Sequence, residues 1–109
     1  MMVNIDMVKE IAISLPGTVE QEHWGRPAYK AGKKIYATVW PLKMKIVVLL
    51  DTVQQSVYVD AAPDVFIPVE GGWGKKGATY VDLLKVKKNM CKEVLKVAWT
   101  NATNKYFEF

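Results

Sequence analysis

The sequence has little of what disulfide-linked, zinc-binding and membrane-spanning proteins need. It contains one cysteine and one histidine among 109 residues, and its longest apolar run is residues 46–50. The single cysteine, Cys91, excludes an internal disulfide framework and is typical of a reducing compartment. With His23 it supplies too few ligands for a zinc site, so we expect no metal and no cofactor. A run of this length is too short to span a bilayer, so we expect no contact with a membrane.

The rest of the composition is that of an ordinary globular protein, with half of the residues hydrophobic and about a quarter charged. A chain of 109 residues predicts one domain, residues 1–109, with one modest core. The first ten residues contain Asp6, Lys9 and Glu10 within an apolar pattern, which is unlike a signal peptide. We therefore expect a cytoplasmic protein that is a monomer or a weak dimer.

Charge is distributed unevenly along the chain. Residues 26–45 contain six basic residues and no acid, whereas residues 51–70 contain four acids and no base. Such blocks can create a basic face and an acidic face on the folded protein. The alternative is that the net charge of +4 only keeps a small protein in solution.

Hydrophobic periodicity predicts helices at both ends and strands between them. Apolar residues recur at helical spacing over residues 4–15 and 87–103. Alternating or β-branched segments predict strands at residues 19–24, 28–30, 34–40, 43–50 and 77–83. Residues 51–64 favour a short helix that contains Val53, Val57 and Tyr58, with an extended segment as the alternative. Residues 65–72 are expected to be extended and loop-like. This order predicts an α+β fold, an antiparallel sheet of about five strands with the N- and C-terminal helices packed on one face.

No pattern in the sequence points to catalysis. His23 has no partner besides Glu20 and Glu22, which alternate onto the other face of a strand. Cys91 lies at helical spacing among apolar residues, so we expect a buried, unreactive thiol. Residues 71–77, GGWGKKG, resemble a phosphate cradle but lack the G-x-x-x-x-G-K-[ST] pattern. We therefore expect the protein not to be an enzyme.

Two turns combine glycine with basic residues and could contact phosphates. The predicted DNA-contacting cations are Arg26, Lys30, Lys33 and Lys34 in a hairpin and Lys75 and Lys76 in the glycine-rich turn. Tyr29 and Trp73 stand among them, where they would stack on bases or shape the turn. The alternatives are that Trp73 packs onto the core and that the lysines only protect sheet edges from aggregation.

Three stretches in this order resemble the MmcQ/YjbR family: LPGTVEQEHWGRPAYKAGKKIYATVW, PDVFIPVEGGWGKKGATYVDL and VLKVAW. The resemblance extends over roughly residues 7–99. It implies a small bacterial α+β domain with a fold like that of CyaY, the bacterial frataxin. It also implies a DNA-binding label, which the family carries because of a pair of wing-like elements. The iron association of frataxins is not implied, because the first predicted helix carries only Asp6 and Glu10 as acids.

The sequence thus predicts a non-catalytic DNA-binding or regulatory protein that contacts double-stranded DNA through two basic wings. The alternative is a protein–protein interaction module without nucleic-acid binding. In that case the acidic residues within 51–70 would suit a basic partner.

Overall fold

The computed structural model describes residues 3–103, which form a six-stranded sheet and four α-helices. The strands are β1 (Val19–His23), β2 (Arg26–Ala31), β3 (Lys34–Trp40), β4 (Lys45–Leu49), β5 (Phe66–Pro68) and β6 (Ala78–Asp82). The helices are α1 (Ile5–Ser14), α2 (Thr52–Ala61), α3 (Gly71–Lys75) and α4 (Lys88–Thr103), with a 3-10 turn, η1, at Pro41–Lys43. The strand order is β1-β2-β3-β4-β6-β5, and every neighbouring pair is antiparallel.

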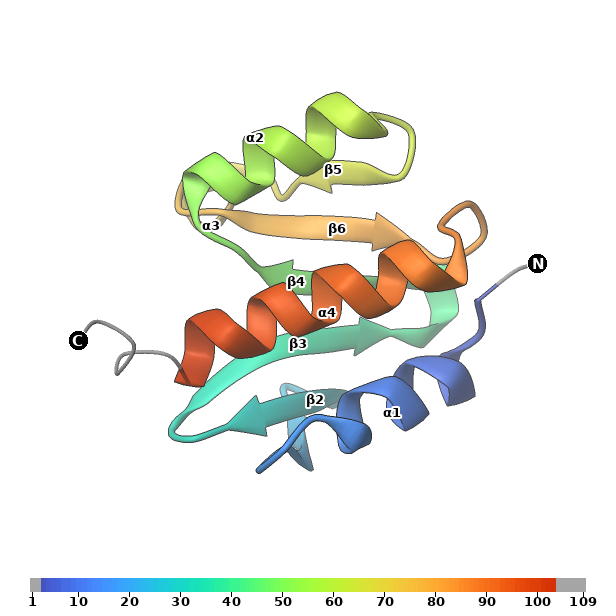
Figure 1. Ribbon diagram of the computed structural model, residues 1–109, viewed down its shortest axis with the longest axis vertical. Coiled ribbons are helices and arrows are strands. Elements are labelled where there is room, and N and C mark those ends of the chain that lie inside the picture. Colours follow the sequence, from blue (N-terminus) through green and yellow to red (C-terminus); the bar gives the residue numbers. More distant parts are fainter. Residues whose placement is uncertain (1–2, 104–109) are drawn as a thin grey trace.

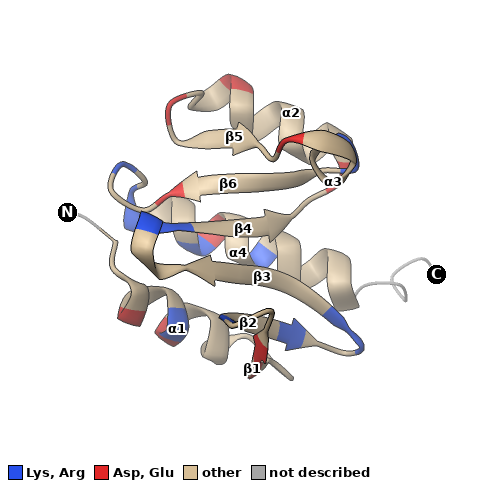
Figure 2. Cartoon of the chain, turned by 180° about the vertical axis from the view of Figure 1, so that it is seen from behind, with Lys and Arg blue, Asp and Glu red and all other residues tan. Residues whose placement is uncertain are grey.

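Helices α1, α2 and α4 lie on the same face of the sheet (Figure 1). The apolar core fills the space between them and the sheet, and it includes Tyr36, Phe66 and Leu95. The predicted α+β fold with both terminal helices on one face is therefore confirmed, and α2 joins them there. We call the opposite side of the sheet the open face, because none of these three helices covers it (Figure 2).

The sheet has one strand more than the sequence predicts. The additional strand is β5, which pairs through Phe66 with Val81 and through Ile67 with Tyr80 of β6. It was predicted only as an extended segment because it is three residues long and ends in Pro68. A proline lacks the backbone N–H, and an edge strand tolerates it because one side makes no ladder bonds.

The short helix favoured after residue 51 is confirmed as α2, and its buried face is narrow. Asp51 caps α2 in a capping box, so one acid of the acidic segment has a local structural role. Tyr58 is the buried residue of α2, and its ring lies 5.0 Å from that of Phe66. Val53 and Val57 are exposed. The reason is that α2 packs at the β5 edge of the sheet and meets the core along a narrow stripe.

The glycine-rich residues 71–77 contain a short helix, α3 (Gly71–Lys75), where the sequence predicted a turn. Glycine is a poor helix former, so contacts with the rest of the protein must stabilise α3. A Cβ at Gly74 would overlap the carbonyl oxygen of Val69, which shows how closely the two backbones approach. Gln55 of α2 donates its side-chain amide to the carbonyl oxygens of Gly74 and Ala78, at 3.0 and 3.1 Å. Glycine at position 74 and the amide of Gln55 therefore fix the position of α3.

We predict that Gly74→Ala destabilises the protein much more than Gly72→Ala. The added methyl at position 74 must displace α3 or the neighbouring backbone, at a cost of about 1–3 kcal/mol. Position 72 has no neighbouring heavy atom within 4 Å, and alanine there favours the helix. Urea unfolding of both variants measures the difference. Equal losses of stability would show that α3 does not depend on this close approach.

A candidate functional site on the open face of the sheet

Strand register determines which side chains share the open face. Residues paired across antiparallel strands point to the same side of the sheet. One row across the sheet consists of Gln21, Ala28, Thr38, Val47 and Tyr80. The neighbouring row contains His23, Arg26, Trp40, Lys45 and Asp82. Cations and aromatic rings are therefore concentrated in adjacent positions of the open face.

Two of these cations are stacked on aromatic rings. The guanidinium carbon of Arg26 lies 3.9 Å from the ring centroid of Trp40. The Lys45 ammonium lies 3.7 Å from the ring centroid of Tyr80 and 5.5 Å from that of Trp40. The Trp40 indole N–H donates to the hydroxyl of Thr38 at 3.3 Å. Cation–π contacts of this kind hold long side chains against the sheet and keep their charge on its surface.

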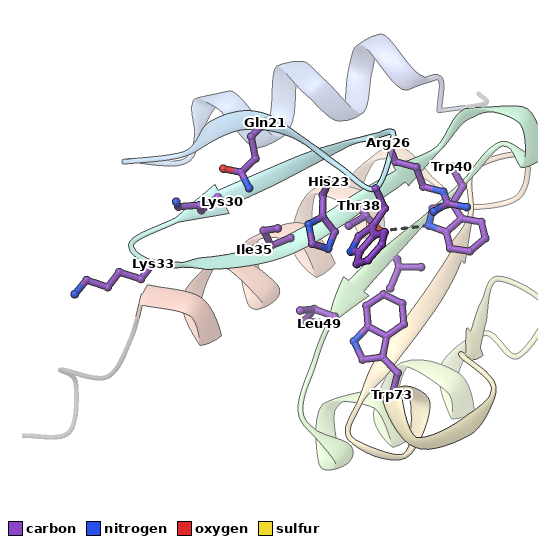
Figure 3. Close-up of a pocket in the computed structure, with 12 residues that line it drawn as sticks. Gln21, His23, Arg26, Lys30, Lys33, Ile35, Thr38, Trp40, Leu49 and Trp73 are labelled. Carbon is purple, nitrogen blue, oxygen red and sulfur yellow. Dashed lines mark hydrogen bonds between the residues drawn. The ribbon is translucent and has the colours of Figure 1, made fainter.

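A hollow of about 670 Å³ lies on the open face, and we call it the central hollow (Figure 3). Strands β1 to β4, the β1–β2 and β2–β3 turns, and α3 supply its lining. The lining residues are Gln21, His23, Trp24, Arg26, Lys30, Lys33, Ile35, Thr38, Trp40, Val47, Leu49 and Trp73. Three of them are cations and none is a carboxylate, so the central hollow offers a positive, partly aromatic surface.

Trp24 stands at the tip of the β1–β2 hairpin. Trp24 and Gly25 have φ values of 56° and 79°, while His23 and Arg26 on either side pair with each other. Positive φ at both central residues defines a type I′ turn, for which asparagine and glycine are preferred. The indole is nevertheless 84% exposed, and its neighbour in an edge-on contact is the His23 ring, at 6.0 Å. The core therefore does not hold Trp24 in this conformation.

Trp73 approaches the central hollow from α3, across from His23 (Figure 3). Its side chain is 44% exposed and is absent from the hydrophobic core. The interpretation that Trp73 packs onto the core is therefore wrong. The close approach of Gly74 to Val69 and the hydrogen bonds from Gln55 hold α3 instead.

The structure separates the predicted phosphate-contacting cations into three groups. Arg26, Lys30 and Lys33 line the central hollow. Lys34 lines a smaller hollow beside the end of α4. The exposed Lys75 and Lys76 lie at the end of α3, outside the lining of the central hollow.

Tyr29 does not lie on the surface, so the prediction that it contacts DNA is wrong. It is 1% exposed, because strand alternation turns it towards the helices while Ala28 and Lys30 point to the open face. Burial, and then the neighbouring charge of Glu20, raises the pKa of the Tyr29 hydroxyl. The hydroxyl is therefore uncharged at neutral pH and belongs to the core.

Sequence reasoning missed Trp24, Trp40 and Lys45 as residues of this face. The missing signal was strand alternation, since Thr38, Trp40 and Lys45 fall on the side opposite the core residues of β3 and β4. Alternation could have revealed Trp40 and Lys45 once the core side of β3 and β4 was known. Trp24 lies in a turn, where alternation gives no information.

His23 and Glu20 lie on opposite faces of β1, as predicted. Glu20 is on the helix side, where its carboxylate lies 3.7 Å from the Lys9 ammonium of α1. His23 lines the central hollow. The imidazole therefore faces the tryptophans of the hollow and not the acids of its own strand.

An acidic group marks one border of the basic surface. The Tyr80 hydroxyl donates to the Glu70 carboxylate at 3.1 Å. The pKa of Glu70 is lowered by a backbone hydrogen bond, by the Tyr80 hydroxyl and by the charges of Lys45 and Lys43. Glu70 therefore stays negative well below neutral pH. The cations of the central hollow, Arg26, Lys30 and Lys33, lie on β2 and the β2–β3 turn instead.

The remaining reactive side chain, Cys91, lies in the core. It is fully buried, and burial raises the pKa of its thiol to about 11. The prediction of a buried thiol is confirmed.

Within residues 3–103 no cluster of three or more His, Cys, Asp or Glu side chains could hold a metal ion. In the same range no helix has the length and apolar character that crossing a bilayer requires.

Comparisons with known proteins place the chain in a family. The model of the YjbR family matches residues 13–101, so the chain belongs to this family. The fold is similar to the crystal structure of the Deinococcus radiodurans protein DR2400, with domain DUF419, at a TM-score of 0.78. That similarity covers 97% of this chain and 83% of the other, at 17% sequence identity, and it concerns the fold alone. No curated protein matches the sequence.

We predict that Cys91 does not react with a thiol reagent in the folded protein at about pH 8. The thiol is buried, and its raised pKa keeps it protonated, whereas only an exposed thiolate reacts rapidly. Absorbance of released thionitrobenzoate measures the reaction, and denatured protein is the positive control. Rapid labelling of the native protein would contradict this burial.

Proposed function

We propose that this YjbR-family protein is a non-catalytic nucleic-acid-binding protein and that the open face is its binding surface. The observation that carries the proposal is the positive, partly aromatic central hollow, which has Arg26, Lys30 and Lys33 but no carboxylate in its lining. Neutralisation of several backbone phosphates by cations on one surface is the main source of nucleic-acid affinity. Such a surface also attracts polyanions from a distance.

The geometry of the stacked cations favours binding over a role in solubility alone. The Arg26 guanidinium lies over Trp40, and the Lys45 ammonium lies over Tyr80. Stacking covers the flat side of a guanidinium and leaves its edge N–H groups able to donate to phosphate oxygens. By contrast, the lysines on the outer side of α4 are interrupted by Glu93. The open face therefore combines fixed positive charge with aromatic rings, which simple solubility does not require.

We predict that the protein binds labelled mixed-sequence DNA with an affinity that falls linearly on a log–log plot against salt. The charge reversal Lys30→Glu with Lys33→Glu weakens this binding because it adds repulsion beside the central hollow. Each phosphate that the variant no longer neutralises reduces the slope by roughly 0.9 with duplex DNA and by roughly 0.7 with a single strand. Fluorescence anisotropy at several salt concentrations measures both quantities, with the duplex and with its isolated strands.

The matched control is Lys92→Glu with Lys96→Glu, which makes the same charge change on the exposed side of α4. It is expected to weaken binding less, and melting temperatures verify that both variants are folded. Equal effects of the two pairs would place the interface elsewhere. Absence of binding to duplex and single strand at low salt would reject the proposed function.

We predict a smaller effect for Lys75→Ala with Lys76→Ala than for Lys30→Ala with Lys33→Ala. Both α3 lysines lie outside the lining of the central hollow, so they contribute only longer-range attraction. Anisotropy titrations of the two double variants at one salt concentration make the comparison. A larger effect of the α3 pair would favour an interface built from two basic wings.

One observation favours a protein partner as a second candidate. Trp24 is 84% exposed, and Leu42 is also strongly exposed beside it, lining a second hollow with it. Exposed apolar side chains that lie together are typical of protein-binding surfaces. Binding of a protein at this face without any salt-dependent nucleic-acid binding would support this candidate.

A further inference from the structure

We propose that the open face binds single-stranded nucleic acid and that unpaired bases stack against Trp24 and Trp73. This inference rests on the proposed function and adds to it the state of the strand and the base contacts. It is carried by two adjacent hollows and by two tryptophans whose rings stack with no cation from residues 3–103.

The two hollows adjoin each other, because both are lined by Trp24. The second hollow has a volume of about 560 Å³ and is lined by Leu42 and Lys43 in addition to Trp24, Arg26 and Trp40, which it shares with the central hollow. Neither lining contains a carboxylate. The pair of hollows therefore offers a continuous path longer than one nucleotide needs, which fits an extended strand better than a free mononucleotide.

The aromatic residues of the open face fall into two groups. Arg26 and Lys45 already occupy the rings of Trp40 and Tyr80. Within residues 3–103 the cation–π contacts do not involve Trp24 or Trp73, and both indoles are substantially exposed. A base stacks on an aromatic ring only where a ring face is accessible. Trp24 and Trp73 are therefore the rings that can take bases, while Trp40 and Tyr80 position cations.

The arrangement around the central hollow suits a flat ligand. Trp73 approaches from α3 and the imidazole of His23 from the other side (Figure 3). Trp24 adjoins His23 through their edge-on contact, and the partly exposed Leu49 of β4 also lines the hollow. A base entering here meets aromatic rings at its sides and an aliphatic side chain of the sheet below.

The backbone conformation of Trp24 supports a role in binding. A left-handed conformation is costly for a bulky residue, and exposure of an indole to water gives up the stability that its burial would provide. Asparagine in the first position of the I′ turn would remove both costs. Strained residues that project into a binding surface commonly serve a ligand.

The positive charges lie where the phosphates of such a strand would run. Lys30 and Lys33 are beside the central hollow, Lys43 is beside the second hollow, and Arg26 lines both. Glu20 and Glu22 line a third hollow at the β1 edge, which adjoins the other two through Arg26. Strand alternation turns both carboxylates away from the open face, on which Gln21 and His23 lie. In duplex DNA the bases are paired and stacked on one another, so a duplex offers these rings only its backbone.

The experiment compares four ligands by anisotropy or competition: a labelled oligothymidylate of about 12 nucleotides, the same backbone with abasic sites, the corresponding duplex, and thymidine monophosphate. The oligothymidylate should bind most tightly. Removal of its bases should weaken binding roughly 25-fold or more, because two stacked bases are lost and each is expected to contribute roughly fivefold or more. Thymidine monophosphate should compete only weakly, because it fills one hollow and carries few charges.

Variants at the two tryptophans test the base contacts separately from the charge. Trp24→Leu and Trp73→Leu keep an apolar side chain but remove the ring, so each should weaken oligothymidylate binding roughly fivefold or more. Each should leave the salt slope and the weaker duplex binding unchanged. Trp24→Phe keeps an aromatic ring and should retain most of the affinity. Val57→Ala removes an exposed apolar side chain from α2, away from the open face, and should leave the affinity unchanged. Melting temperatures show whether each variant is folded.

The outcomes distinguish this inference from the proposed function. Equal binding of the oligothymidylate, the abasic strand and the duplex would reject base stacking and leave nucleic-acid binding intact. If folded Trp24→Leu and Trp73→Leu bound the oligothymidylate with unchanged affinity, base stacking would likewise be rejected and nucleic-acid binding would stand. If thymidine monophosphate bound as tightly as the oligothymidylate, the inferred ligand would be a mononucleotide and the single strand would be rejected. No binding by any of the four would reject both proposals, and a protein partner would then be sought.

Discussion

The one-sided covering of the sheet is the constraint on which the rest of the structure depends. Three helices pack on one face, so the side chains that a strand turns to that face are buried and the alternate ones lie on the open face. In β3 and β4 this alternation buries Val39 and Ile46 and sends Trp40 and Lys45 to the open face. The same period of two residues therefore builds both the core and the basic, aromatic surface.

The position of α3 depends on a second constraint, which joins the covered face to the open one. The amide of Gln55 reaches from α2 to Gly74, and the absence of a side chain at Gly74 allows α3 to approach Val69. Helix α3 carries Trp73 to the edge of the central hollow. Gln55, which belongs to the helical layer, thus helps to position the ring of Trp73 at the open face.

The sequence predicted elements with strong periodicity and failed where tertiary contacts decided the outcome. The terminal helices and five strands follow from apolar spacing, whereas α3 depends on the close approach of Gly74, which no local pattern reveals. Tyr29 and Lys30 look equivalent in a basic hairpin, but alternation in β2 buries the first and leaves the second at the open face. The charge pattern of the sequence therefore indicated which hairpin carries the candidate surface. The strand register in the structure was needed to tell which of its residues face outward.

Stability and the proposed binding depend on different faces of the same sheet. The core residues stabilise the fold from the helix side, so an exposed and conformationally costly Trp24 is tolerated at the hairpin tip. On the open face, Trp40 and Tyr80 hold cations in place, and Trp24 and Trp73 leave their rings accessible. Because these tryptophans contribute little to the core, a change that removes a ring can alter binding while the protein remains folded. A surface organised in this way can evolve new ligand preferences at the turn and at α3 without repacking the interior.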